Sequence, residues 1–580
     1  MTKKLIYLTF IVLLVPALSY CIEPEVSKPA VIYERVQVTT DRKLYIAGEN
    51  LLFGFYLIDT RINKLASYQS TGYILLKNTN GTIVGKSQVK IREGRTSGVI
   101  YLNDTLQSGY YQIEAFTNFM RNGSPDFFFR TEIMVANRFD KDLFGLVSGA
   151  TVPSTSTTSD YSIPISKELI SLVPVKPICN KRERNGFKLI IKDTGIKSAN
   201  VTVSVVEKNS VEENAVRNIR TIKGPLAQNI ANGELPAYLA EDKYDELIGQ
   251  LTDADNGNGL PNRTLYLSSP DTVANLNYTT TDSKGYFRFA LQDYYNGKDL
   301  YIKVKKNGDE TLKPKITIDS KYTTKPFIPE FQPVDSSTLS YIQNSQDVVK
   351  IQKSYLQLES QQKTEFKSGT DIPYLYRTPN YVTFPGDYSD LKNFTEIARE
   401  LISTLRIRKR DNINHAEILD YINGRYMDSD PLIIADGVLI DDINQLLPYG
   451  SKDIRKVEVI SSEWYMDLQE FNGVIAVFSN NNLMNNIFLN TTFNIKIKAN
   501  EYFQTPEFYT PDYSLTDVNA WDPDFRQVLY WNPDIQINKE NEQTIYFYTS
   551  DYAATYVIKV RGIADNGEVI ESYCEFEVND

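Results

Sequence analysis

The chain has 580 residues, of which 42% are hydrophobic and 23% are charged, and its formal net charge is −11. This ordinary globular composition excludes a wholly disordered chain and a membrane protein with many spans. A single histidine, His415, excludes any site in one copy that needs two or three imidazoles. The chain is acidic and has no basic block with interleaved aromatics, and this composition argues against nucleic acid as a partner.

Residues 1–20 have the features of a secretory signal. Lys3 and Lys4 precede an apolar run from Leu5 to Val15, and small residues lead to a cleavage point after Ser19. We therefore expect export, and a mature charge of about −13 once both lysines are removed. No later run approaches ~18 apolar residues, so we expect no membrane-spanning helix in the mature chain.

The three cysteines do not form a disulfide framework. Cys21 is a candidate for lipidation, although Tyr20 before it is not the small residue that a lipobox has. The alternative is an ordinary periplasmic or surface protein, so membrane association is peripheral or through a lipid anchor. Cys179 and Cys574 are expected to be lone strand cysteines in different domains, and their pairing in an oxidising compartment is left open.

The 30–140 segment alternates apolar and polar residues between Gly, Asn and Asp turns, which predicts a β-sandwich. Its sequences DRKLYIAGENLLFGFYL (41–57) and LQSGYYQIEAFTNFMRN (106–122) resemble the macroglobulin-type sandwich of large bacterial surface proteins. The Cys-Gly-Glu-Gln thioester of the protease-trapping macroglobulins is absent, so the resemblance does not imply protease trapping. A Ser/Thr-rich linker (144–162) follows, and strands at 187–191 and 201–206 predict a second sandwich over 165–235.

The third unit, 245–320, contains IGQLTD, GLPNRTLYLSS and TTTDSKGYFRF in that order. This order resembles the carboxypeptidase regulatory-type β-sandwich, a non-catalytic module of seven strands. Asp253–Gly257 superficially matches a calcium loop, but it lacks the later glutamate, so we expect a turn and no metal site. Residues 336–360 predict an amphipathic helix that connects domains, with a partner-binding helix as the alternative.

From 380 to 482 the pattern changes to mixed α/β. Residues 390–405 predict a helix, and apolar runs surround Asp436-Gly437, Glu458 and a strand that follows Gly473. The PL…DGV, DI…VEV and GVI…V sequences resemble the plug domain of TonB-dependent outer-membrane transporters that import glycans and peptides. Asp436-Gly437 is expected to form a hairpin turn, and none of these residues needs to do chemistry.

The chain departs from that family after the plug-like domain. About a hundred residues follow, and they lack the repeated ~10-residue alternating strands of a transporter barrel, so we expect no transport by this chain itself. Residues 485–580 instead predict a C-terminal β-sandwich. Its aromatic residues, Trp521 and Trp531 among them, are expected in the sandwich core and in contacts between domains, with stacking of either Trp on a glycan as the less favoured alternative.

The sequence therefore predicts a mainly β chain: tandem Ig-like or macroglobulin-like β-sandwiches with one α/β plug-like domain. This module order resembles exported Bacteroidetes-type proteins, which implies a non-enzymatic scaffold at the outer membrane that engages a TonB-dependent transporter or another envelope complex. The alternative is a surface module that binds glycan or peptide and feeds a transporter. A third hypothesis is a hydrolase that uses two carboxylates, but no acidic pair in the sequence has a recognisable catalytic context. His415 is expected at the surface, on a polar loop or at a helix start. We therefore assign no catalytic, cofactor or metal residues.

Overall fold

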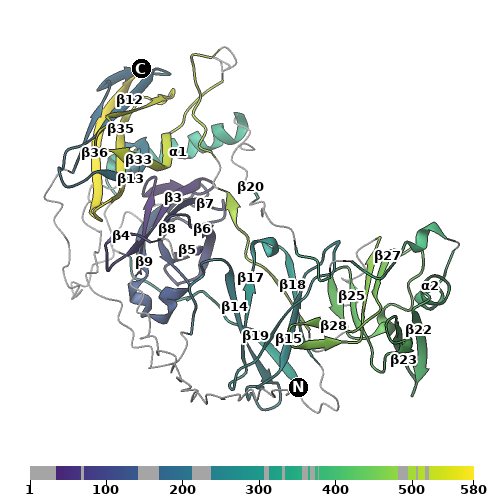
Figure 1. Cartoon of the computed structure of the whole chain (residues 1–580). Coiled ribbons are helices and arrows are strands. Elements are labelled where there is room, and N and C mark those ends of the chain that lie inside the picture. Colours follow the sequence, from purple (N-terminus) through teal and green to yellow (C-terminus); the bar gives the residue numbers. More distant parts are fainter. Residues whose placement is uncertain are drawn as a thin grey trace, which may run out of the picture.

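The computed structural model describes residues 34–66, 71–140, 169–211, 237–305, 313–329, 334–355, 364–365, 372–376, 378–388, 390–480, 494–504, 507–515 and 522–580. The expected signal, Cys21, the expected linker at 144–162 and Trp521 lie outside these residues. Within them the chain is mainly β, and the prediction of tandem sandwiches is confirmed. Figure 1 shows the sandwiches extending from the C-terminus towards a mixed α/β unit at the far end.

The first sandwich is built from two sheets that enclose an aromatic core, in which Phe53, Phe55, Tyr73 and Phe116 are fully buried. One sheet contains β1 (Glu34–Thr40), β3 (Asn50–Asp59), β4 (Lys64–Leu65) and β7 (Arg95–Tyr101). The other has the order β2 (Leu44–Ile46), β9 (Phe129–Ala136), β8 (Gly109–Phe116), β5 (Thr71–Asn78) and β6 (Ile83–Lys90).

The second sandwich is discontinuous, and we call it the composite sandwich. One sheet has the order β10 (Ile170–Pro174), β12 (Arg184–Ile191) and β34 (Gln543–Tyr548). The other has the order β11 (Ile178–Asn180), β36 (Val569–Asn579), β35 (Thr555–Ala564), β13 (Ser198–Glu207) and β33 (Val528–Asn538). The expectation of separate sandwiches at 165–235 and 485–580 is therefore wrong. Alternation identifies the buried face of a strand such as β13, but it does not identify the neighbouring strand.

The third sandwich consists of a three-stranded and a four-stranded sheet. The first has the order β17 (Tyr286–Leu291), β14 (Asp245–Asp253) and β19 (Pro314–Ile318). The second has the order β16 (Asn277–Thr280), β15 (Thr264–Ser268), β18 (Asp299–Val304) and β31 (Asn494–Lys498). Because β31 comes from the segment expected to begin the C-terminal sandwich, the 245–320 unit does not supply all the strands of its own fold.

The mixed unit, 372–480, has a central sheet that is covered on both faces. Its order is β21 (Tyr381–Thr383), β27 (Ile454–Ile460), β30 (Val474–Ser479), β25 (Leu432–Ala435) and β26 (Val438–Ile440). One face packs with α2 (Phe394–Leu401) and with a three-stranded sheet of the order β22 (Leu405–Arg410), β23 (Ile413–Asp420) and β24 (Arg425–Tyr426). The other face packs on the third sandwich, and β28 (Trp464–Met466) pairs with β29 (Gln469–Phe471) nearby. Burial on both faces explains the nearly continuous apolar runs of β25 and β30.

The helix expected over 390–405 is shorter in the structure, where α2 covers Phe394–Leu401. Asn393 caps it, because its side-chain oxygen accepts a hydrogen bond from the backbone N–H of Glu396. Leu405, which fits the apolar stripe of a longer helix, is instead the first residue of β22. The apolar stripe predicts only that Leu405 is buried. That holds in the strand, where Leu405 is buried, and it would hold equally in a longer helix.

The connecting helix α1 (Ser336–Tyr355) ends before the expected residue 360, and residues 356–360 lie outside the described part of the chain. Tyr341, Ile342 and Val349 of α1 pack on β2 of the first sandwich. Gln527, at the entry to β33, donates a hydrogen bond to Ser345 Oγ (2.8 Å). The helix thus contacts both the first and the composite sandwich. Neither α1 nor α2 has the length and apolarity that a membrane span requires.

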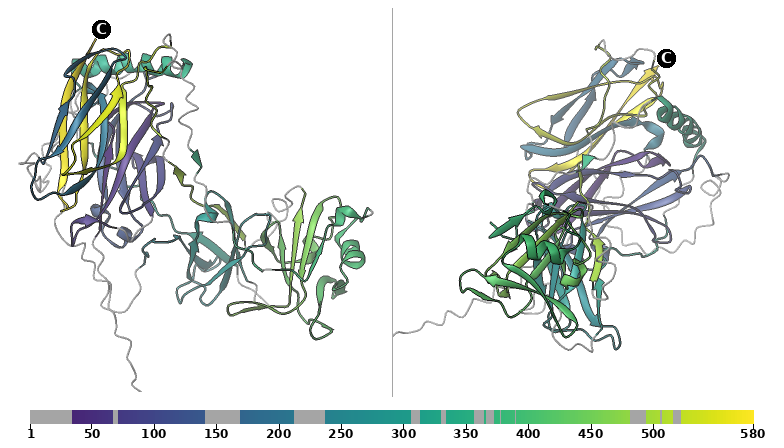
Figure 2. Two further views of the ribbon diagram at one scale, coloured as in Figure 1. Left: turned by 45° about the horizontal axis from the view of Figure 1, so that its top comes forward. Right: turned by 90° about the vertical axis from the view of Figure 1, so that its right-hand side faces the viewer.

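The domains are nested in one another. The composite sandwich is interrupted between β13 and β33, and the third sandwich, which is inserted there, is itself interrupted before β31. Within that second gap lie α1, a short strand β20 (Thr364–Glu365) that pairs with β32 (Phe503–Gln504), and the whole mixed unit. The left view of Figure 2 shows the result: the third sandwich and the mixed unit extend away from the first and composite sandwiches. We call these two units together the arm.

The first and composite sandwiches pack side by side through buried polar contacts. Lys559 of β35 is buried and donates its Nζ hydrogen bond to the backbone oxygen of Thr40 (2.8 Å). Tyr56 of β3 hydrogen-bonds Thr202 of β13 through their hydroxyls (2.6 Å). Burial holds the pKa of Lys559 well below its ordinary value. Such paired polar groups make this interface specific in geometry.

Candidate functional site

The four residues expected to belong to a plug-like motif, Asp436, Gly437, Glu458 and Gly473, all lie at the central sheet of the mixed unit. Asp436 and Gly437 form the two-residue turn between β25 and β26, with φ of 47° and 83°. These positive values at both positions are those of a type I′ hairpin turn, as the Asp-Gly pair predicts. The Asp436 carboxylate accepts hydrogen bonds from the backbone N–H (2.6 Å) and the hydroxyl (2.7 Å) of Ser479, so it fastens the end of β30.

Gly437 also marks the contact between the mixed unit and the third sandwich. A Cβ at this position would lie 2.6 Å from the backbone oxygen of Ser269 and 2.7 Å from the backbone nitrogen of Asp271. That same Asp271 N–H donates to the backbone oxygen of Asp436 (3.0 Å). The turn therefore docks against a loop of the third sandwich, and this close contact requires glycine at position 437.

The other two motif residues are structural as well. Glu458 of β27 accepts a hydrogen bond from the hydroxyl of Tyr376 (2.7 Å) and pairs with Lys456 (2.8 Å). Burial, and then the bond to Glu458, raises the pKa of Tyr376 above its ordinary value. Gly473 has φ of 84°, and a Cβ there would lie 2.6 Å from the backbone oxygen of Ile460.

A pocket of about 330 Å³ lies where the arm's two units meet. Its wall consists of side chains from the third sandwich, the 372–375 segment and the β28–β29 hairpin, namely Asn275, Leu276, Tyr294, Tyr295, Ile372, Pro373, Tyr374, Leu375, Trp464, Tyr465, Met466 and Asp467. Tyr374 and Tyr465 are 71% and 56% exposed. The size lies at the lower end of the range for small-ligand sites, which is ~300–1,000 Å³.

The pocket combines aromatic faces with one carboxylate. Trp464 packs against Phe471 with ring centroids 5.6 Å apart, so its plane is held in position. Asp467 lies in the turn between β28 and β29, with φ of 50°. Aromatic rings beside polar groups bind the apolar faces of sugars, or proline and aromatic side chains of peptides. These residues carry no motif that predicts a site from sequence, and the adjacent aromatic pair Trp464-Tyr465 is the one signal that could have indicated them.

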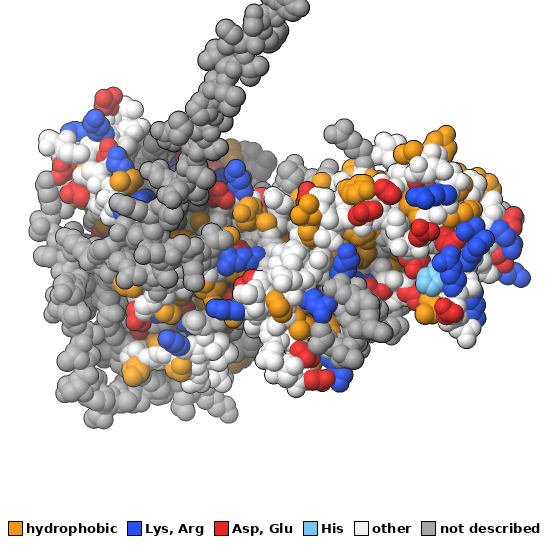
Figure 3. All heavy atoms as spheres, turned by 60° about the horizontal axis from the view of Figure 1, so that its bottom comes forward, with side chains coloured by type: hydrophobic (Ala, Val, Ile, Leu, Met, Phe, Trp, Pro, Cys, Tyr) orange, Lys and Arg blue, Asp and Glu red, His pale blue; other side chains and the backbone are white. Residues whose placement is uncertain are grey.

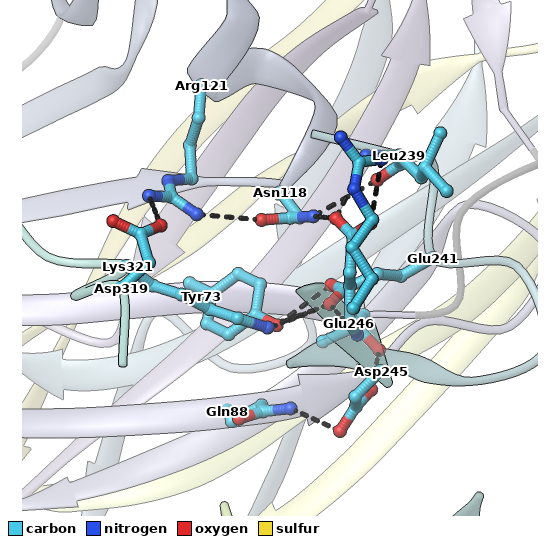
Figure 4. A network of polar contacts seen from close by, with 12 residues as sticks. Tyr73, Gln88, Asn118, Arg121, Leu239, Glu241, Asp245, Glu246, Asp319 and Lys321 are labelled. Atoms are coloured by element: carbon cyan, nitrogen blue, oxygen red, sulfur yellow. Dashed lines mark hydrogen bonds and ion pairs between the residues drawn. The ribbon is translucent and has the colours of Figure 1, made fainter. Parts of the chain in front are cut away.

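A second polar cluster joins the first sandwich to the third, and we call it the joint (Figure 4). Glu241 is fully buried; it accepts hydrogen bonds from the hydroxyl of Tyr73 (2.8 and 3.0 Å) and pairs with Lys321 (2.8 Å). Burial is the main cause that raises the pKa of Glu241, and Lys321 opposes it. Its partner Tyr73 comes from β5 of the first sandwich.

Further ion pairs and hydrogen bonds extend the joint. Gln88 donates to Asp245 (2.8 Å), and Asn118 donates to Glu246 (2.8 Å). Arg121 pairs with an Asp319 oxygen 2.7 Å away. In each pair the first residue belongs to the first sandwich and the second to the third sandwich, as Figure 4 shows. Since the buried carboxylates are used to hold two domains together, the cluster fixes how the arm leaves the rest of the molecule.

His415 lies on a strand, β23, and not on the expected loop or helix start. Its Nδ1 lies 2.8 Å from Asp430 Oδ2, and its side chain is 34% exposed. The described residues contain no group of three or more His, Cys, Asp or Glu arranged to hold a metal ion. The Asp253 side chain accepts hydrogen bonds from Asp255 N–H and Asn256 Nδ2, as a turn requires.

Cys179 and Cys574 lie on neighbouring strands of one sheet, β11 and β36, so the expectation of different domains is wrong. Both are free thiols. Burial raises the pKa of Cys179 to about 11 and that of Cys574 to about 12, which suppresses the reactive thiolate. Trp531 is 4% exposed. It lies opposite Ser204 of β13, whose hydroxyl donates to the backbone oxygen of Asp41 in the first sandwich, so Trp531 is buried on the side of the sheet that faces that sandwich. This burial excludes it as a stacking platform for a glycan.

No family model matches the sequence, and no curated protein matches it. Among solved structures the chain is similar to Salmonella alpha-2-macroglobulin reacted with methylamine, with 9% identity over 95% of this chain and 23% of that chain and a TM-score of 0.16. It is also similar to E. coli alpha-2-macroglobulin activated by porcine elastase, with 10% identity over 94% of this chain and 44% of that one and a TM-score of 0.24. The chain thus spans less than half the length of these proteins, and at such TM-scores the likeness carries no argument about activity.

Proposed function

We propose that the protein is a non-enzymatic, exported scaffold of the outer membrane, and that its mixed unit engages a TonB-dependent transporter or another envelope complex. The observation that supports this best is the nesting of domains, in which the mixed unit lies at the end of the arm. A unit presented in this way is available to a partner while the remaining sandwiches anchor it.

Contacts within the arm and at its base hold it in one arrangement. β31 returns the chain from the mixed unit into the sheet of the third sandwich, and the Asp436-Gly437 turn docks on the same sandwich. The joint then ties the third sandwich to the first. A partner that binds the mixed unit would thus meet a preorganised surface, which lowers the entropic cost of binding.

Affinity copurification from detergent-solubilised envelopes tests the proposal. The tagged full-length protein is expected to recover a transporter or other envelope protein. Tyr421 and Ile422 are exposed apolar residues of the mixed unit, and changing both to Ser should reduce the recovery. Ile328→Ser, at an equally exposed apolar position outside the mixed unit, is the matched control. Recovery of the protein alone and in soluble form contradicts the proposal.

The pocket favours a second candidate function, a surface module that binds glycan or peptide and passes it to a transporter. In affinity gels that contain polysaccharide, the protein should be retarded, and Trp464→Ala and Tyr465→Ala should abolish the retardation. Tyr509→Ala, a change at an exposed tyrosine outside the pocket, should leave it intact. Failure to be retained by any polysaccharide or immobilised peptide counts against this function.

A further inference from the structure

The β22–β23 hairpin has a basic outer face. Its turn, Asp411-Asn412, has φ of 48° and 66°, so it is a two-residue type I′ turn that fixes the register of the two strands. One face is apolar and packs in the mixed unit through Leu405, Ala416 and Ile418. Since side chains alternate along a strand, the opposite face of β22 presents Arg406, Arg408 and Arg410.

These three arginines surround one carboxylate. Glu417, on the neighbouring strand, is buried and pairs with Arg406 and Arg410, while Arg408 Nε lies 3.8 Å from it. Arg406 is further held by Tyr426, whose ring centroid lies 3.3 Å from the guanidinium carbon. Because one carboxylate cannot neutralise three guanidinium groups, the face carries an excess of positive charge on a chain whose net charge is −11.

The positive charge is accessible. The side chains of Arg408 and Arg410 are each 54% exposed, and Lys409 between them is also exposed. Figure 3 shows Lys and Arg side chains gathered beside the one histidine, His415, at the end of the molecule. His415 faces Asp430, so the nearest carboxylate on that side is used within the unit.

β22 is also an edge strand. It pairs with β23 on one side, and no strand of the described residues pairs with its other side. A two-residue turn closes on a hydrogen-bonded pair, here Arg410 and Ile413, so the backbone groups of Arg408 and Arg406 also point to β23. Those of Lys409 and Ile407 consequently face outward, where an added strand would bond to them.

We propose that the outer edge of β22 is a docking site for an extended acidic segment of a partner protein, which adds to the hairpin as a further strand. Acidic side chains at every second position would recur about 7 Å apart and lie beside Arg406, Arg408 and Arg410. A bilayer of anionic lipids would use the charge but neither the backbone groups nor this spacing. The site stands on the strand itself, whether or not the partner is a transporter.

Fluorescence anisotropy with the full chain tests the proposal. The probe is a labelled peptide of about ten residues in which Glu and Val alternate, and the comparison peptide has the same composition with Glu and Val in separate blocks. The alternating peptide is expected to bind about tenfold more tightly than the block peptide. Arg408→Glu with Arg410→Glu should weaken it about tenfold or more, whereas Lys452→Glu with Lys350→Glu, two exposed lysines elsewhere, should change it less than about twofold.

A pair of changes at Lys409 separates strand pairing from charge alone. Lys409→Pro removes the outward N–H, while Lys409→Ala removes the same charge and keeps the N–H. Only the proline variant should lose most of the binding, with unchanged circular dichroism showing that it folds. Equal binding of both peptides, equal effects of Pro and Ala, or binding to phosphatidylglycerol vesicles but to neither peptide would overturn the proposal. In the last two cases, the positive charges at this edge would attract acidic partners without strand pairing, or would serve only to prevent this edge from pairing with other strands.

Discussion

Removing the ammonium group of Lys321 tests whether the joint holds the arm to the first sandwich. Lys321 lies 2.8 Å from Glu241, which is fully buried and also receives the hydroxyl of Tyr73. Lys321→Met keeps the length of the side chain and leaves the buried carboxylate without its cation. Tyr73→Phe instead keeps the cation and the ring, which stacks on Phe116 with centroids 5.6 Å apart. It removes the hydroxyl, which donates to Glu241 and accepts a hydrogen bond from Lys321. The bond between Lys321 and the hydroxyl is lost in both variants, so it does not contribute to the difference between them.

The two changes are expected to differ in cost. Breaking a buried pair from one side costs about 3–5 kcal/mol, because a buried charge is left unpaired. Losing one hydrogen bond to a charged acceptor costs about 1.5–3 kcal/mol. The backbone N–H of Glu246 still donates to Glu241 (2.7 Å) in both variants, which places each cost at the lower end of its range. We therefore expect Lys321→Met to lose about 1.5 kcal/mol more than Tyr73→Phe.

The pH dependence gives a second measure of the same interaction. Burial raises the pKa of Glu241 in the folded state, and the loss of Lys321, which opposes that rise, raises it further. A carboxyl with a raised folded pKa costs stability above that pKa, and the cost disappears as the pH falls and the group takes up a proton. The destabilisation by Lys321→Met should accordingly be smaller at about pH 5 than at about pH 8.

Scanning calorimetry combined with hydrogen exchange in β14 measures these effects, because a chain of several domains does not unfold in one step. Lys313→Met is the matched control, since Lys313 forms an exposed pair with Asp255 in the same sandwich and should cost less than about 1 kcal/mol. A cost for Lys321→Met that equals the control, or one that does not change with pH, refutes the reasoning.

Three further predictions concern other parts of the chain. Burial raises the pKa of Glu34 from 4.5 to about 8, so the free energy of unfolding should fall as pH rises through that window. In urea titrations, Glu34→Gln should remove up to about 5 kcal/mol of this fall. In thermal unfolding, Gly437→Ala should cost about 2 kcal/mol more than Gly424→Ala. Both glycines have positive φ, but only at Gly437 would the added Cβ contact backbone atoms of another segment. Equal costs would contradict the docking of the turn. Cys179 and Cys574 should react with a thiol reagent at about pH 8 only after unfolding, and rapid reaction of the native protein would contradict their burial.

Local features of the fold were predictable because the residues that form them are close in sequence. The Asp436-Gly437 turn needs only its own two residues and the flanking apolar runs, so a hairpin turn at this position could be predicted from sequence. The end of α2 did not, because Leu405 satisfies the apolar stripe of a helix and the buried face of a strand equally well. Tertiary packing decides between such alternatives.

The pocket illustrates the same limit at a larger scale. Tyr294, Tyr374 and Trp464 each look like an ordinary aromatic of a small β-domain, and they come from separate parts of the chain. They form one wall only because the mixed unit docks on the third sandwich. No spacing rule in the sequence connects them, and the adjacent aromatic pair Trp464-Tyr465 was the one local signal, which was not used for a prediction.

The nesting itself has a simple physical basis. Val206 near the end of β13 lies opposite Val528 at the start of β33, so these strands form an antiparallel pair in which residues 207–527 take the place of a turn. The entropic cost of closing a loop rises by only about 0.6 kcal/mol for each doubling of its length, so replacing a short turn by this segment costs about 4 kcal/mol, and less once the segment is folded. β18 and β31 repeat the arrangement one level inward. A domain can therefore be inserted at little cost wherever two adjacent strands present neighbouring ends, and the inserted domain is then tethered at both of its own ends. This double tether is what distinguishes a presented arm from a domain on a flexible linker, which would reorient freely.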